Sequence, residues 1–433
     1  MKSLAGIPDI GPRLRSLPLA SLAGRTKGSA PTWFLVGRMD KSLRMRSHSQ
    51  MKFFRTTVAA IAVFVSLAVF APLASAQKYL FYVGTYTDGT KSKGIYAFRY
   101  DAETKGVTSL GVAAESVNPS FLATSPDGRF LYAVNEVGNY KGPNSGGVSA
   151  FSIDRATGKL TFLNEVASRG ADPCYITVDK TGKWVLVANY TGGSVAVFPV
   201  QEDGKLGDAS DFVQHTGHGP NKERQEGPHA HSIDLSPDNR FAFVDDLGLD
   251  TLFTYKFDAK TGKLAELTTT HLDPGAGPRH FALHPSGKYA YVISEMGHTV
   301  TTLAANLQDG TFKPLQTVLT IPPDYKDRND DAEVEVDPSG RFLYASNRGH
   351  DSIIAFAVDP NKGTLRSLGM VAGMIKEPRS FEIDPTGTLL FGENQTWGIL
   401  VVFKIDPKTG ELTQTGQQFS VPSPVCLKFV KVP

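Results

Sequence analysis

Side chains that can bind an anion and move a proton recur in this chain at two equivalent positions of a repeat. Guanidinium groups bind carboxylates and oxyanions through paired hydrogen bonds, whereas imidazole and carboxylate groups accept or donate protons. If the fold brings the repeats around one cavity, these groups define a site for a small anionic molecule. The candidates are His231, Arg279 and Arg379 at the first position, and Glu136, Glu295, Arg348 and Gln395 at the second.

Two histidines, His229 and His231, are separated by one residue, a spacing that also occurs in metal sites. No cluster of Cys, His or Asp with ligand spacing accompanies them, so the sequence predicts no metal site. We therefore assign His229 to substrate binding and His231 to proton transfer.

Some of the arginines have a simpler interpretation as structural ion pairs. Arg348 is close in sequence to Asp351, and Arg379 is close to Glu377. Pairs of this kind often join neighbouring repeats without taking part in chemistry. Both interpretations stay open for these two arginines, whereas a functional role is favoured for Arg279 and Glu295.

The repeat itself is marked by a short turn phrase that occurs seven times, in forms such as Thr157-Gly158-Lys159-Leu160. A second turn, such as Pro126-Asp127-Gly128, alternates with it and precedes an aromatic or aliphatic run. A period near 50 residues with turn chemistry in each repeat is typical of propellers and solenoids. The glycines of the first turn lie 46 to 58 residues apart, at Gly106, Gly158, Gly204, Gly262, Gly310, Gly363 and Gly410.

One repeat contains four β-type runs, which we term a to d: residues 121–125, 130–135, 147–153 and 160–166. Four antiparallel strands in about 50 residues make a propeller blade. Runs of type b begin seven times, and the last run, 425–430, is a lone a strand that completes the first blade. We predict an all-β fold, a seven-bladed β-propeller closed by its C-terminal strand.

The two faces of such a propeller differ. The start of strand a and the end of strand b lie on the same face, and strands a line the central channel. Two long polar connections, 214–229 and 321–331, belong to that face. Loops on a rigid scaffold commonly carry function, so we place the candidate residues around one mouth of the channel.

The N-terminal part of the chain has a different character. Residues 51–76 have a basic start, an apolar core and the small residues Ala74 and Ala76, the pattern of a secretory signal. Residues 1–50 are interpreted as an upstream extension or, alternatively, a basic disordered arm. The propeller domain is then 77–433, exported to the periplasm or secreted. No other long apolar run occurs, which predicts no membrane anchor.

Charge and cysteine content narrow the possible partners. Beyond residue 76 the chain has 34 basic and 41 acidic side chains, a net charge of −7. This balance disfavours binding to nucleic acid or to anionic membranes. The two cysteines, Cys174 and Cys426, are predicted to be buried free thiols.

Four motifs resemble those of the seven-bladed lactonase family, which includes propeller-type 6-phosphogluconolactonases and carboxy-cis,cis-muconate cyclases. The resemblance covers nearly all of 77–433 and implies a site of one His, two Arg and one Glu, which fall on His231, Arg279, Glu295 and, by a weaker match, Arg348. It also implies no cofactor. The motifs are 82–86, 227–231, 277–280 and 346–353.

The predicted function is hydrolysis of a sugar-acid lactone by a monomeric protein. His231 would accept the proton of water, Glu295 would orient water or protonate the leaving oxygen, and Arg279 with Arg348 or Arg379 would hold the anion. An export signal favours an unphosphorylated aldonolactone over a phosphorylated one. Two alternatives stay open: cycloisomerisation of a carboxy-muconate-type dicarboxylate, and non-enzymatic binding of a protein or ligand by a secreted propeller.

Overall fold

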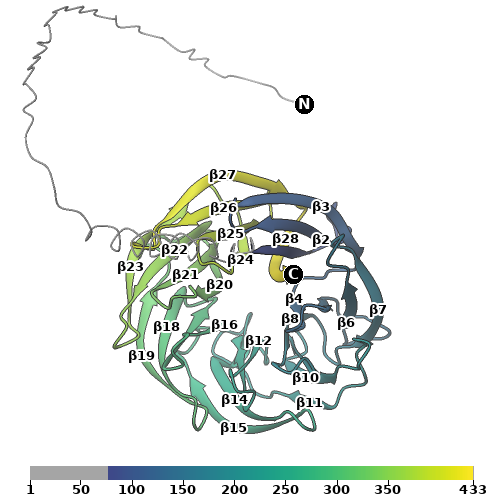
Figure 1. The fold of residues 1–433 in the computed structure, drawn as a ribbon. Coiled ribbons are helices and arrows are strands. Elements are labelled where there is room, and N and C mark those ends of the chain that lie inside the picture. The colour runs from purple at the N-terminus through teal and green to yellow at the C-terminus, as the bar shows by residue number, and fades with distance from the viewer. Residues whose placement is uncertain (1–76, 433) are drawn as a thin grey trace, which may run out of the picture. The chain divides into compact units, whose positions relative to one another are not determined.

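The computed structural model describes residues 77–432, which form seven four-stranded antiparallel sheets. The predictions for 1–50 and 51–76 lie outside the described residues. Figure 1 shows the sheets arranged around a central axis, with β4, β8, β12, β16 and β20 towards the centre and β7, β11, β15, β19, β23 and β27 at the rim. The predicted seven-bladed β-propeller is therefore confirmed.

The first blade contains β28 (Pro424–Val432), β1 (Lys78–Thr85), β2 (Gly94–Asp101) and β3 (Gly106–Glu115). The second contains β4 (Leu122–Thr124), β5 (Phe130–Asn135), β6 (Gly147–Ile153) and β7 (Leu160–Ala167). The third contains β8 (Pro173–Val178), β9 (Trp184–Asn189), β10 (Ser194–Pro199) and β11 (Asp211–Gln214). The fourth contains β12 (Ala230–Leu235), β13 (Phe241–Asp246), β14 (Thr251–Asp258) and β15 (Lys263–His271).

The fifth blade contains β16 (Pro278–Leu283), β17 (Tyr289–Ser294), β18 (Thr299–Asn306) and β19 (Thr311–Leu319). The sixth contains β20 (Asp330–Val336), β21 (Phe342–Arg348), β22 (Ser352–Val358) and β23 (Leu365–Ala372). The seventh contains β24 (Pro378–Ile383), β25 (Leu389–Asn394), β26 (Ile399–Ile405) and β27 (Leu412–Ser420). The described part of the chain has a single short 3₁₀ helix, η1 (Leu247–Leu249), and no helix in it is long and apolar enough to cross a membrane.

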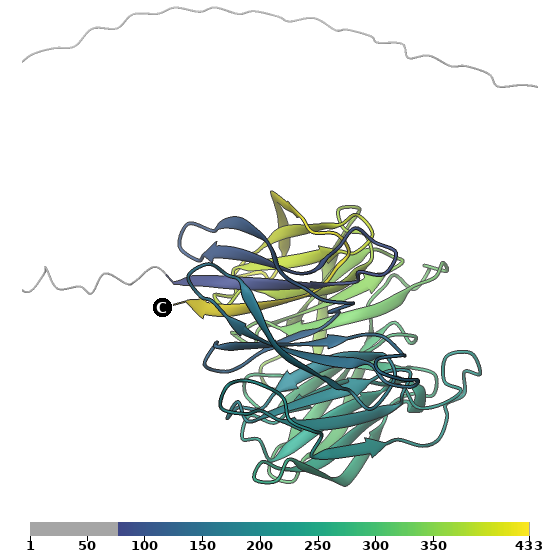
Figure 2. The same cartoon turned by 90° about the vertical axis from the view of Figure 1, so that its right-hand side faces the viewer.

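Ring closure joins the two ends of the propeller. Strand β28 pairs antiparallel with β1, from Lys78 opposite Val432 to Gly84 opposite Cys426. Figure 2 shows this pair, one strand purple and the other yellow, side by side in one sheet. The predicted closure by the C-terminal strand is confirmed. It also leaves the inner edge of β1 paired rather than open.

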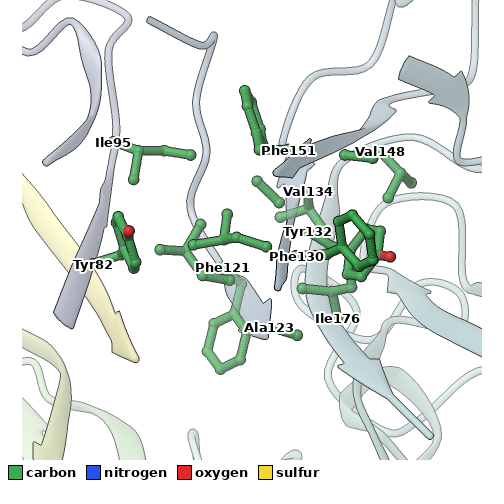
Figure 3. Packing of buried hydrophobic residues seen from close by; sticks show 14 of the residues in the cluster. Tyr82, Ile95, Phe121, Ala123, Phe130, Tyr132, Val134, Val148, Phe151 and Ile176 are labelled. Atoms are coloured by element: carbon green, nitrogen blue, oxygen red, sulfur yellow. The ribbon is translucent and has the colours of Figure 1, made fainter. Parts of the chain in front are cut away.

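The core lies between the sheets. Strand b of each blade is buried on both faces; all six residues of β5, for example, are buried, whereas β7 at the rim is half exposed. Figure 3 shows how Tyr82, Tyr132, Phe151 and Ile176 from neighbouring blades pack together with Phe121. Burial of such aromatic and aliphatic surface is the main stabilising contribution in the fold.

The repeated turn glycines make contacts between blades. Gly410 has a φ of +76°, and a Cβ there would lie 2.3 Å from Cδ1 of Phe342, which opens strand b of the preceding blade. The hydroxyl of Tyr344 on the same strand donates to the carbonyl oxygen of Gly410, at 2.8 Å. Only glycine fits there, because both the backbone conformation and the ring exclude a side chain. The same glycine–ring contact occurs at Gly204, Gly262, Gly310 and Gly363.

We expect Gly410→Ala to destabilise the protein by about 3 kcal/mol, from backbone strain plus overpacking against Phe342. Gly416→Ala is the matched control, since Gly416 has a φ of +83° but a Cβ at this residue would meet no atom within 4 Å. Gly416→Ala should lower the free energy of unfolding by about 1 kcal/mol, from backbone strain alone. Denaturant unfolding of both variants measures the difference, and equal losses would show that the glycine–ring contact contributes nothing.

Candidate active site

A cavity of about 520 Å³ opens at the predicted mouth of the channel. Its walls come from blades one to seven and from the two long polar connections, which supply Arg224 and Arg328. Its volume lies in the range of small-molecule sites. The lining residues are Tyr86, Glu136, Cys174, Tyr190, Arg224, His231, Glu295, Arg328, Asp330, Arg348 and Arg379.

The residues that open the inner strands are β-bulge residues. In β12, Ala230 pairs with Asp246 and Ser232 pairs with Asp245, so His231 is left without a partner in the ladder. A bulge redirects the extra side chain out of the regular alternation of a strand. Similar register shifts occur at Cys174, at Arg279, at Ala332 and Glu333, at Arg379 and Ser380, and at Val425.

Glu295 follows β17 and is surrounded by three guanidinium groups. Its Oε2 accepts from Nε of Arg279 at 3.1 Å and from Nη2 of Arg348 at 2.8 Å, and its Oε1 accepts from Nη2 of Arg224. Burial acts to raise the pKa of Glu295, but the three arginines outweigh burial and lower this pKa to about 2. Glu295 is therefore a carboxylate at neutral pH and has no proton to donate.

Arg279 lies beneath the cavity rather than on its wall. It is 1% exposed, and its Nη1 donates to the carbonyl oxygen of Ala332 at 2.6 Å. The same nitrogen contacts Nε2 of His280 at 3.1 Å, while Nδ1 of His280 lies 2.8 Å from Oε1 of Glu333. Burial lowers the pKa of His280 to about 4, so its neutral ring donates from Nδ1 and accepts at Nε2. This chain fixes Arg279 in place below Glu295.

His231 lines the cavity with a neutral ring. Burial, and then the charge of Arg279 and its neighbours, moves its pKa well below the usual value. Its Nδ1 is buried without a hydrogen-bond partner, so Nε2 is the nitrogen available to a ligand. His229 is buried behind Tyr190, on which it stacks with ring centroids 4.6 Å apart.

Arg379 is the one arginine of the cavity lining, within residues 77–432, that contacts no carboxylate. In residues 77–432, no carboxylate oxygen lies within 4.0 Å of its guanidinium, and no side-chain hydrogen bond is formed by it; the group lies over the ring of Tyr86, 5.4 Å from the centroid. The hydroxyl of Tyr86 donates to Glu136, 2.9 Å from either carboxylate oxygen. Glu136 thus has no guanidinium group within 4.0 Å among the described residues, and its contact is the Tyr86 hydroxyl.

The structure brings most of the predicted residues together but separates three of them from the cavity. His231, Glu295, Arg348, Arg379 and Glu136 line it. His229 and Arg279 support the wall from behind. Gln395 does not face the cavity, because the β25–β26 turn places it in a neighbouring hollow, formed by connections of the seventh and the first blade.

The structural ion pairs considered for Arg348 and Arg379 are absent from the described part of the chain. Arg348 pairs with Glu295. The carboxylate of Asp351 instead binds the ammonium group of Lys376, and the carboxylate of Glu377 accepts from the Thr396 hydroxyl.

Three side chains of the cavity lining were missed by reasoning from the repeat: Arg224, Arg328 and Asp330. Arg224 binds Glu295 and Asp330, and Asp330 is also held by Arg328. All three come from the connections 214–229 and 321–331. The length and polarity of those connections indicated which face of the propeller carries the cavity, but they did not indicate which side chains point into it.

The opposite end of the channel has one cationic side chain among its lining residues, Lys428, against four arginines at the mouth described above. A smaller cavity of about 300 Å³ is lined there by Glu333, Glu335 and Glu382 around Lys428. Burial raises the pKa of Glu382, with Lys428 bound to its Oε2 at 2.6 Å. An anion would therefore be attracted to the arginine-lined mouth rather than to this one. Across residues 77–432, no group of three or more His, Cys, Asp or Glu is arranged to hold a metal ion.

Both cysteines are free and buried, as predicted. Cys174 lies at the cavity wall, with Sγ 3.3 Å from the carbonyl oxygen of His231. Burial raises the pKa of its thiol, so Cys174 is protonated at neutral pH and is not an activated nucleophile.

The seven sheets define a propeller with an arginine-lined cavity at one end of its channel. The family model described as "Lactonase, 7-bladed beta-propeller" matches residues 80–429. The chain belongs to this seven-bladed lactonase family.

Three similar proteins illustrate the range of the family. A 6-phosphogluconolactonase of Bacillus subtilis is 43% identical over 82% of this chain and 99% of its own length. The crystal structure of a putative 6-phosphogluconolactonase from Bacteroides fragilis is 38% identical, covers 83% of this chain and 99% of its own, and superimposes with a TM-score of 0.77. A periplasmic gluconolactonase of Pseudomonas aeruginosa is 33% identical, covers 82% of this chain and all of its own, and has a TM-score of 0.76.

We expect Glu295→Gln to destabilise the protein by about 3 kcal/mol at pH 7, because three guanidinium groups lose their shared counter-ion. The pKa of Glu295 is about 2 in the folded protein and near 4.5 when unfolded. Its stabilisation is therefore present above pH 4.5 and is lost as the pH falls towards 2. Denaturant unfolding from pH 7 to pH 3 should show that the difference in unfolding free energy between Glu295→Gln and the unmodified protein becomes smaller as the pH falls.

Exposed Glu223, in the connection that carries Arg224, provides the control Glu223→Gln. This variant should match the unmodified protein at every pH. A loss for Glu295→Gln that is independent of pH would mean that the carboxylate does not act as the counter-ion of the arginines.

Proposed function

We propose that the protein hydrolyses the lactone of an unphosphorylated sugar acid in the arginine-lined cavity, outside the cytoplasm. The observation that carries this proposal is the Arg379 guanidinium, which faces the cavity without a carboxylate partner among residues 77–432. Hydrolysis of a lactone develops negative charge on the carbonyl oxygen and leaves a carboxylate product. A fixed, unpaired cation stabilises both.

The remaining arginines act as a preorganised group. Arg224 and Arg348 line the cavity and are held by Glu295, so neither has to move when the oxyanion forms. Donors fixed in advance stabilise a transition state more than mobile ones do. In this proposal Glu295 positions the arginines and does not act as the acid, because it is ionised at neutral pH.

Proton transfer falls to Glu136 and His231. Glu136 accepts the proton of the attacking water, since the other cavity carboxylates, Glu295 and Asp330, are bound by guanidinium groups. Neutral His231 orients this water through Nε2. Water adds to the carbonyl carbon, the ring C–O bond breaks, and the proton taken by Glu136 passes to the leaving ring oxygen.

The related proteins support the reaction and the compartment. The Bacillus subtilis relative is named a 6-phosphogluconolactonase and the Pseudomonas aeruginosa protein a periplasmic gluconolactonase. The secretory pattern in residues 51–76 agrees with the second of these. Phosphorylated sugars are not expected outside the cytoplasm, so the unphosphorylated lactone is the proposed substrate.

Removal of the free cation tests the oxyanion assignment. Arg379→Gln should lower kcat for glucono-1,5-lactone by about 10²- to 10³-fold, the loss typical of one oxyanion donor. Proton release, corrected for spontaneous hydrolysis, measures the rate for this substrate and for its 6-phosphate side by side. Arg341→Gln, an exposed arginine at an a–b turn on the opposite face, is the control and should retain full activity.

Unchanged turnover in Arg379→Gln would refute the oxyanion role. Faster turnover of the 6-phosphate by the unmodified protein would instead overturn the proposed substrate while leaving the reaction intact.

The proton acceptor is tested with Glu136→Gln, which keeps the shape and the hydrogen bond from Tyr86 but removes the base. We expect kcat to fall about 10²-fold or more, with KM little changed. The exposed residue Glu115 offers the control Glu115→Gln. If Glu136→Gln keeps its kcat, the water proton must go elsewhere, and His231 becomes the remaining acceptor on the cavity wall.

A further inference from the structure

A second hollow, which we term the rim hollow, lies where the seventh blade meets the first. It has a volume of about 520 Å³. Three connections form it: the β1–β2 loop, the β25–β26 turn and the β27–β28 link. Its lining residues are Gly89, Thr90, Lys91, Gln395, Thr396, Trp397, Gly398, Pro422 and Ser423.

The rim hollow combines an exposed indole with neutral hydrogen-bonding groups. Trp397 is 51% exposed, although tryptophan is a residue that is usually mostly buried. The amide of Gln395 and the hydroxyl of Thr396 lie on the same turn, and Lys91 is the single charged residue in the lining. A flat aromatic face beside amide and hydroxyl groups suits a pyranose ring, which has an apolar face and a rim of hydroxyl groups.

The rim hollow adjoins the cavity across one residue, Tyr86. The side chain of Tyr86 lines the cavity next to Arg379. The backbone of Tyr86 is bound on the side of the rim hollow. Its N–H donates to the carbonyl oxygen of Ser423 at 3.2 Å, and its carbonyl oxygen accepts from the Thr90 hydroxyl at 2.8 Å. Both Ser423 and Thr90 line the rim hollow. A molecule in the cavity could therefore extend over Tyr86 onto Trp397.

The two hollows differ in charge. Four arginines and three carboxylates line the cavity, whereas no guanidinium or carboxylate lines the rim hollow. The cavity suits the part of a substrate where charge develops, and the rim hollow suits a part that stays neutral. A second anionic group would find only Lys91 there, without the paired donors that bind such groups tightly.

We propose that the rim hollow binds a neutral pyranose ring, stacked on Trp397 and hydrogen-bonded by Gln395, and that the substrate is the lactone of a disaccharide acid. The unit that carries the lactone occupies the cavity and the second sugar occupies the rim hollow. The statement about the substrate depends on the proposed lactone hydrolysis. The statement that the rim hollow binds a sugar does not.

Sugar binding is tested without catalysis by saturation-transfer NMR on the full protein. The probes are methyl β-cellobioside and methyl β-maltoside, which contain no lactone and differ in linkage. We expect transfer to the ring protons of at least one probe, lost in Trp397→Ala. Phe162→Ala is the matched control, because Phe162 is equally prominent at 57% exposed but lies on the outer strand β7. No transfer from either probe, or transfer that survives in Trp397→Ala, overturns the proposal.

The link to catalysis is tested by kinetics with glucono-1,5-lactone and with cellobiono- and maltobiono-1,5-lactone. Trp397→Ala should raise KM about tenfold for the better disaccharide lactone and leave kcat and the monosaccharide values unchanged, as expected for loss of one stacking contact. Equal effects on both sizes of substrate would overturn the role of the rim hollow in substrate binding. If no lactone is hydrolysed, the proposed function fails, and the NMR result still decides whether the rim hollow binds a sugar.

Discussion

Closure of the ring is the constraint on which the rest of the structure depends. Seven blades must meet around one axis, and at five of the seven junctions a turn glycine of one blade lies against the aromatic residue that opens strand b of the preceding blade, as Gly410 does against Phe342. The tyrosine hydroxyl that reaches the same glycine, from Tyr344 in this case, adds a directional bond to the apolar contact. Because neither partner tolerates a larger or differently shaped neighbour, the blades are held at a fixed spacing, and strands far apart in sequence are held at fixed distances around one axis.

Fixed distances matter because the cavity contains more charge than a protein interior usually accepts. Arg224, Arg279 and Arg348 come from three different parts of the chain and share the carboxylate of Glu295. Each guanidinium would be costly to bury alone, and the carboxylate would lose its proton less readily without them. The β-bulges at the start of the inner strands turn Arg279, His231 and Arg379 out of the normal alternation and toward the axis. The backbone irregularity and the charge cluster therefore support each other: the bulges aim the side chains, and the ion pairs hold them there.

The sequence was sufficient for the fold because the fold depends on local signals. Turn glycines and strand-opening aromatics such as Phe130 and Trp184 are visible within a single repeat. The C-terminal strand is recognisable because it stands alone, without the other three strands of a repeat. The site was only partly predictable, since alignment of the repeats locates a backbone position but not a rotamer. Arg279 and Gln395 occupy the aligned positions, yet one is directed below the cavity by Ala332 and Glu295 and the other is carried away by a turn. Arg224 lies in one of the two long connections, outside the strands on which the repeats align, so alignment of the repeats could not reveal it.

The separation of charge along the channel explains why one mouth suits a developing anion. Glu295 is kept ionised by the three arginines it holds, so it cannot serve as a proton donor, and its contribution is to keep cations fixed where water would otherwise screen them. Arg379 remains without such a counter-ion in the described part of the chain, and in the proposed mechanism the negative charge that it meets is the one that develops on the reacting molecule. At the far end Lys428 lies among carboxyl groups, and burial raises the pKa of two of them, Glu335 and Glu382. The rim hollow is lined by neither arginines nor carboxyl groups. In the two proposals, chemistry that depends on charge and recognition that depends on shape are therefore divided between two adjoining hollows, with Tyr86 between them.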